Sequence, residues 1–249
     1  MRASRSVVFV AVGVLVAAAC GSDEGSTAAL MSPVAGARVA GGVELEMAAE
    51  GITIEEAGVA RDGAGHFHVV ADVGCAKTGD VIGKDADHVH FGAGQTTGLI
   101  YLGPGSHDLC LQVGDGAHQA LGITDRHTIE VGIADQAEFC DVVIEVDELF
   151  DAVDNSSDDF SVKQVGYENI RRLAAQLTAA LDFVDPGSRD DLAATVSFVD
   201  AMTSALVEAA DLDEAERALE PIFETVGAEL PGAGWILDNC GIDIAGEDE

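Results

Sequence analysis

The feature that most constrains the fold is a change in hydrophobic period near Asp135. Before it, apolar and polar residues alternate, as in VELEM, where Val43, Leu45 and Met47 share one face. After it, apolar residues recur at steps of three and four, beginning with the run 139–153. Alternation is typical of strands and the longer period of helices. We therefore expect an α+β chain in which the two kinds of structure occupy separate regions.

Residues 31–134 contain six or seven short runs of the alternating kind, separated by turns rich in Gly and Pro. One of them, HDLCLQV, places Leu109, Leu111 and Val113 on the same face. Short strands at this spacing predict an antiparallel, immunoglobulin-like β-sandwich.

Residues 135–249 are expected to form a small helical bundle. Ser188 and Asp191 resemble a cap that opens the third helix, and Pro221 is expected to bend the fourth. The helical period predicts five helices, at about 138–153, 162–184, 188–210, 213–229 and 234–241.

The chain is strongly acidic, with 45 Asp and Glu against 12 Lys and Arg and a formal net charge of −33. Residues 135–249 carry 29 of the acidic side chains and only five basic ones. A polyanion repels nucleic acid and anionic lipid head groups, so we expect neither as a partner. The acidity is expected to provide a solvated surface, with a surface that collects cations as the alternative.

The first 20 residues resemble a bacterial lipoprotein signal peptide. Arg2 and Arg5 precede an uncharged run that is shorter than the ~20 residues of a membrane span, and small residues lead up to Cys20. The resemblance implies that residues 1–19 are removed, that Cys20 is lipidated, and that residues 20–30 form a flexible tether. The alternative is a cleaved signal without a lipid. We expect an exported chain, anchored to the outer face of the cytoplasmic membrane beside an unidentified envelope partner.

Four cysteines remain after Cys20, an even number that suits an oxidising compartment. Three pairings are possible. We expect Cys75–Cys110 and Cys140–Cys240, because each pair then stays within one of the two regions.

Two H-x-H pairs stand out among the seven histidines: His66 with His68, and His88 with His90. Alternation places each pair opposite apolar neighbours such as Phe67, which should face the core. If the two strands are neighbours, the four imidazoles meet on the outer face of the sheet. We therefore expect a surface histidine cluster.

Three uses of this cluster remain open. Imidazoles suit Zn²⁺, Cu²⁺ or Ni²⁺, and His107 and His118 could add ligands from the edge. The histidines could instead only form hydrogen bonds that fix the segment 74–87, or they could recognise an anionic or carbohydrate ligand. Cu⁺ is disfavoured, because neither Met31 nor Met47 belongs to a histidine motif.

No catalytic constellation stands out, and we do not expect an enzyme. The glycine-rich GAGQTTG lacks the lysine of a phosphate-binding loop and is typical of a hairpin turn. A metal hydrolase would need an open coordination position and a nearby base.

Taken in order, the motifs of residues 31–133 resemble a bacterial family called domain of unknown function 4399. The family pattern has a serine-proline opening, G-H-H-H, H-I-H-F-G-x-G-Q-T, P-G-x-H-T-L and a late aspartate and histidine. Phe67 departs from it, and Cys75 and Cys110 lie outside it. The resemblance implies no established activity. The matching residues are Ser32, Pro33, Gly36, Gly65, His66, His68, His88, His90, Phe91, Gly92, Gly94, Gln95, Thr96, Pro104, Gly105, His107, Asp115 and His118.

The helical region has a resemblance of its own. It is similar to the C-terminal regions of actinobacterial cell-envelope lipoproteins that end in a CGI or CGID tail. The corresponding tail here is Cys240, Gly241, Ile242 and Asp243.

Overall fold

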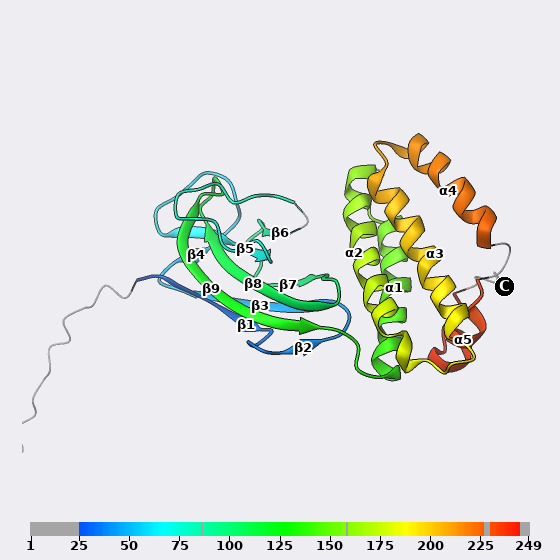
Figure 1. Ribbon diagram of the computed structural model, residues 1–249. Coiled ribbons are helices and arrows are strands. Elements are labelled where there is room, and N and C mark those ends of the chain that lie inside the picture. Colours follow the sequence, from blue (N-terminus) through cyan, green and yellow to red (C-terminus); the bar gives the residue numbers. More distant parts are fainter. Residues whose placement is uncertain (1–24, 86, 158, 227–229, 245–249) are drawn as a thin grey trace, which may run out of the picture.

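A computed structural model describes residues 25–85, 87–157, 159–226 and 230–244. A strand-rich N-terminal region is followed by a helical C-terminal region, as the change of period predicts (Figure 1). The predicted signal peptide, Cys20 and the end of the fourth predicted helix, 227–229, lie outside the described residues.

The strands are β1 Thr27–Ser32, β2 Arg38–Val39, β3 Val43–Glu50, β4 Thr53–Ile54, β5 Ala64–Ala71, β6 His88–Phe91, β7 Thr97–Ile100, β8 Gly105–Gly114 and β9 Ala120–Val131. The helices are α1 Gln136–Asp154, α2 Phe160–Ala179, the 3₁₀ helix η1 Leu181–Phe183, α3 Arg189–Glu208, α4 Leu212–Val226 and α5 Ala233–Cys240.

The strands form two sheets. One has the order β1-β3-β7, and the other has the order β2-β9-β8-β5-β4, with β6 also pairing with β5. Two pairs, β2 with β9 and β4 with β5, are parallel, so the second sheet is mixed rather than antiparallel as predicted. Both parallel partners, β2 and β4, are two-residue strands at the edges of the sheet, and loops rather than hairpins connect them to it. The immunoglobulin-like topology stays a prediction.

The two sheets share one hydrophobic core. Val43, Leu45 and Met47 of β3 enter it from the first sheet, and Leu109 and Leu111 of β8 enter it from the second. The polar residues between them on β3 are exposed. Alternation therefore predicted the buried face of both strands correctly.

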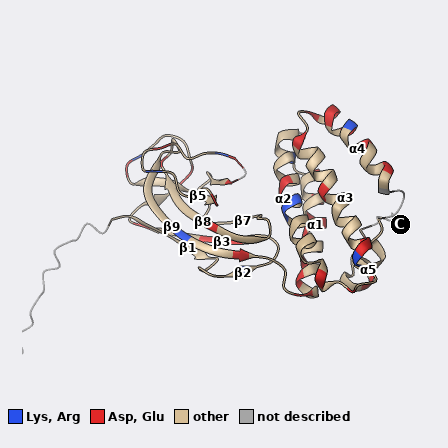
Figure 2. Ribbon diagram, viewed as in Figure 1, with Lys and Arg blue, Asp and Glu red and all other residues tan. Residues whose placement is uncertain are grey.

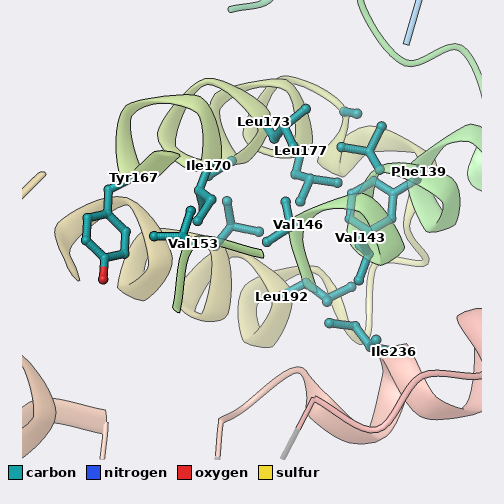
Figure 3. Packing of buried hydrophobic residues seen from close by; sticks show 14 of the residues in the cluster. Phe139, Val143, Val146, Val153, Tyr167, Ile170, Leu173, Leu177, Leu192 and Ile236 are labelled. Atoms are coloured by element: carbon teal, nitrogen blue, oxygen red, sulfur yellow. The ribbon is translucent and has the colours of Figure 1, made fainter. Parts of the chain in front are cut away.

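A second core lies among the helices (Figure 3). Phe139 of α1 packs edge-on against Trp235 of α5, and the predicted disulfide Cys140–Cys240 joins the same two helices. Ser188 lies at the start of α3, as predicted, but its side chain does not form the predicted cap. It makes no cap hydrogen bond to α3 and interacts with Asp185 instead.

The β region and the helices meet at a hydrogen-bonded interface. The buried Gln176 side chain of α2 accepts the Gly41 N–H and donates to the Gly41 and Leu102 carbonyls. Glu145 of α1 accepts the Gly42 N–H, and Arg172 of α2 donates to a carbonyl in the β7–β8 connection. All three side chains come from helices and all their partners from loops between strands, so these contacts fix the orientation of the two regions.

Acidic residues are spread over the exposed faces of the helices, and basic ones are few (Figure 2). Within the part of the chain that the structure describes, no helix combines the length and apolar character needed to cross a membrane.

Candidate metal centre

Strand β5 carries the first H-x-H pair through the middle of the second sheet. All eight of its residues are buried, and β8 pairs with it on one side and β6 on the other. Across β5 and β6, His68 lies opposite His90 and Phe67 lies opposite Phe91. Since successive residues point to opposite faces, the phenylalanine pair enters the shared core and the histidine pair lies behind it.

Four histidines converge on this outer face: His66, His68, His90 and His118. One ring nitrogen from each lies within 4.8 Å of the other three. The Nε2 atoms of His66 and His68 are 2.9 Å apart, and those of His90 and His118 are 3.1 Å apart. Tetrahedral coordination at ~2.1 Å separates ligand nitrogens by about 3.4 Å, which lies between the shortest of these separations, 2.9 Å, and the 4.8 Å limit for the whole set. The four histidines could hold a metal ion.

His118 reaches the cluster from the turn between β8 and β9. Its backbone is left-handed, with φ +66°, a conformation that costs energy for a residue other than glycine. The Asp115 carboxylate stabilises the turn by accepting the N–H groups of Ala117 and Gln119. This turn aims the His118 ring back at the strands.

The cluster is not on the surface, which corrects the sequence-based expectation. His66 and His68 are 0% and 1% exposed, and His90 and His118 are half-buried. Alternation correctly turns the histidines away from the shared core, but loops cover the outer face of the sheet. Ile82 packs beside His68, and the loop after β4 bonds to the backbone of Gly92 and Gly116.

His88 and His107 do not belong to the cluster, although both were candidates. His88 lies opposite Val70, one full strand repeat of about 7 Å beyond the His68–His90 pair, and it bonds to the Asp85 carboxylate. His107 is at the start of β8 and bonds to Asp72 and to the Gly103 carbonyl. For these two histidines, as for His127 with its bond to the Pro33 carbonyl, hydrogen bonding is the role that the structure shows.

Burial favours the uncharged form of three of the four rings, those of His66, His68 and His90. Desolvation, together with the smaller effect of the positive charges that neighbouring rings would carry, lowers the pKa of His66 to about 4 and that of His68 to about 3. Burial also lowers the pKa of His90. Neutral imidazoles have a free lone pair, which is the form that binds a metal ion.

Sequence reasoning missed Gln112, which lies opposite His68 on β8 and is 1% exposed. Its Oε1 accepts the Ala76 N–H. Its Nε2 and the Nδ1 atoms of His66 and His68 are buried without a hydrogen-bond partner in the part of the chain that the structure describes. The alternation of HDLCLQV already places Gln112 on the histidine side of β8, so the pattern could have identified it.

The cluster has an open side. His90 lines a cleft of about 740 Å³ between the β region and helix α2, together with Lys84, Tyr101 and Arg172. The intermediate burial of His90 and His118 leaves one edge of the cluster partly exposed.

The comparison with protein families identifies the stretch that builds this site. A domain of unknown function (DUF4399) is found at residues 45–133. The DUF4399 match begins within β3 and ends just after β9, and it contains all four cluster histidines. This match is shorter than the expected range of 31–133, because the serine-proline motif at Ser32 and Pro33 lies outside it. Comparison with curated proteins found no match to the chain.

Proposed function

We propose that the chain binds a divalent transition metal ion, Zn²⁺ or Cu²⁺, at His66, His68, His90 and His118. The observation that carries the proposal is the convergence of one nitrogen from each ring within 4.8 Å. Four imidazoles without a carboxylate are a donor set that suits these borderline ions better than Mg²⁺ or Ca²⁺.

A binding role is favoured over a catalytic one. Four protein ligands complete a tetrahedral shell, whereas a catalytic zinc site keeps a position open for water. The nearby Asp115 carboxylate accepts two backbone N–H groups on its Oδ1 atom, and these hydrogen bonds give it a structural role in the turn. We therefore propose a non-enzymatic protein.

The setting we propose is the cell envelope, with the chain exported and anchored through lipidated Cys20. Two disulfides, one in each region, support export because cytosolic thiols are kept reduced. The lipoprotein-like N-terminus and the actinobacterial-type C-terminal tail point to the same location.

A structural or interaction module without metal is the second candidate. The Nε2 contacts of 2.9 and 3.1 Å are also hydrogen-bond distances, so the rings could pair with each other in two couples. In that case metal would not stabilise the folded chain.

The test uses the two histidines of one H-x-H pair. Zn²⁺ and Cu²⁺ are titrated into the metal-free chain lacking residues 1–20, with competition against a chelator, for wild type, His90→Asn and His88→Asn. We expect one ion per chain, an affinity at least roughly tenfold weaker in His90→Asn, and an unchanged affinity in His88→Asn.

Thermal unfolding with and without metal separates the two candidates. A bound ion should raise the midpoint of wild type in proportion to the logarithm of metal concentration, and should raise that of His90→Asn much less. No binding to wild type, or equal losses in both variants, would rule out the proposed metal site and leave the structural role.

A further inference from the structure

The disulfide of the β region lies on the same side of the sheet as the histidine cluster. Cys110 and Gln112 are alternate residues of β8, opposite Val70 and His68 of β5. The bond to Cys75 therefore fixes the chain after β5 one strand repeat away from a cluster ligand. Cys75 is half-buried and Cys110 is 2% exposed.

From Cys75 the chain crosses the outer face of the sheet toward the His118 turn. The Ala76 N–H donates to the side chain of Gln112. Next, Gly79 donates to the Ala120 carbonyl, and Ala120 donates to the Asp80 carbonyl. A bridge between Val81 and Gln119 extends this pairing, so residues 79–82 act as a short extra strand along 118–120.

This extra strand, 79–82, bonds to one of the four candidate ligands and comes near a second. The Ile82 N–H donates to the His118 carbonyl at 2.9 Å. The Ile82 side chain is 3% exposed and lies beside His68 over Gly114. His118 is the ligand that needs such support, because its left-handed backbone is unfavourable by itself.

The extra strand has little else to hold it. Residues 77–81 are exposed, with Val81 at 68%, and glycines at 79 and 83 give the segment conformational freedom. An exposed segment of this composition gains entropy when it leaves the sheet. The disulfide opposes that gain by fixing the segment's beginning close to β8.

We propose that the Cys75–Cys110 disulfide, acting through residues 79–82, is a positioning element that holds His118 in the cluster, so that metal affinity depends on the oxidation state of this cysteine pair. The inference rests on the proposed metal function. In the redox step a dithiol reductant gives two electrons and two protons to the S–S bond. Two protein thiols form, and the reductant becomes a cyclic disulfide.

The test compares the two disulfides of the same chain. Zn²⁺ affinity is measured by chelator competition for wild type, for Cys75→Ala with Cys110→Ala, and for the control Cys140→Ala with Cys240→Ala. We expect the first pair of substitutions to weaken binding by roughly 10- to 100-fold, as loss of a supporting contact around a metal site does. The control should bind like wild type, because its disulfide joins α1 to α5.

A double-mutant cycle shows whether the effect passes through His118. In a His118→Asn background, which keeps a residue tolerant of the left-handed conformation, removing Cys75–Cys110 should cause no further loss of affinity. Independent, additive losses would overturn the proposal. The spectrum of bound Co²⁺ gives a second readout: the disulfide variant should show the same change in its visible bands as His118→Asn.

Two further measurements test the proposal without relying on a variant that could fold poorly. They also distinguish failure of the positioning role from failure of the metal function. Folded Cys140→Ala, Cys240→Ala protein can be reduced with a dithiol, freed of it by gel filtration and titrated without refolding. Its affinity should fall to that of the Cys75→Ala, Cys110→Ala variant. Equal affinity in the oxidised and reduced forms would overturn the positioning role alone, whereas an oxidised wild type that binds no metal would overturn the metal function itself.

Discussion

Gly92 shows at the scale of one residue how little free space surrounds the cluster. It lies two residues after His90, and a Cβ atom on it would overlap the His90 ring. That ring is half-buried and attached by a flexible side chain, so it could swing toward solvent at little cost to the fold. Glycine at 92 therefore leaves the His90 ring in the place where it meets the other three.

We predict that Gly92→Ala weakens metal binding while leaving the stability of the metal-free chain nearly unchanged. Zn²⁺ affinity should fall by at least about tenfold, because metal ligation depends on ligand positions to within ~0.2 Å. The free energy of unfolding of the metal-free chain should change by less than about 1.5 kcal/mol. Chelator competition and urea unfolding measure the two quantities.

The control for Gly92→Ala is Gly103→Ala. A Cβ atom on Gly103 would have no neighbour within 4 Å, so this substitution should leave both quantities unchanged. Wild-type affinity in Gly92→Ala would show that His90 does not need this position to bind the ion.

The histidines also show what a sequence pattern can predict. Alternation correctly places the H-x-H pairs on the face opposite Phe67, because the period of a strand is a local property. It cannot distinguish His88 from His90, which have the same spacing and the same face. The register between β5 and β6 decides between them, and it depends on residues far apart in the chain.

At the scale of elements, the cover over the cluster was the part that sequence could not predict. Residues 79–82 have no strand pattern, and they pair with 118–120, which lie far from them in the sequence. Without that pairing, a face turned away from the core is expected to be exposed. Where the structure describes them, the ends of the helices lie within a few residues of the prediction, because the longer helices carry a periodic apolar stripe.

Helices α1 and α2 approach closely at Gly166. A Cβ atom there would overlap the buried Val153 side chain of α1. We predict that Gly166→Ala destabilises the helical region by about 1–3 kcal/mol, although alanine favours helix more than glycine does. Chemical unfolding followed by circular dichroism at 222 nm measures the change.

The matched substitution, Gly234→Ala, lies in α5 where a Cβ atom meets nothing within 4 Å. It should stabilise the chain by up to about 1 kcal/mol, through helix propensity alone. The same sign for both substitutions would show that contact between α1 and α2 does not decide the effect at Gly166.

At the scale of the whole molecule, Glu145 joins the helices to the β region at an electrostatic cost. Its carboxylate accepts the Gly42 N–H, but burial raises its pKa, and the charges of Glu148 and Glu44 raise it further. Because the folded state binds the proton more tightly than the unfolded state, folding opposes ionisation of this group. Stability is therefore lost as pH rises above the normal pKa of a glutamate and through the raised folded-state pKa of Glu145.

We predict that Glu145→Gln stabilises the chain at pH 7 by up to about 1 kcal/mol, because the amide oxygen keeps the Gly42 hydrogen bond without the charge. At pH 4, where the wild-type carboxyl is largely protonated, the two proteins should be equally stable. Urea unfolding at both pH values measures this, with the exposed Glu216→Gln on α4 as the control. A gain of the same size at both pH values would contradict the electrostatic cause.

The three hydrogen bonds of Gln176 have a consequence for how the molecule moves in solution. They connect one helix to Gly41 and Leu102, on two separate loops of the β region, and rotation of either region about the β9–α1 connection would break them. The two regions therefore tumble together, with one rotational correlation time.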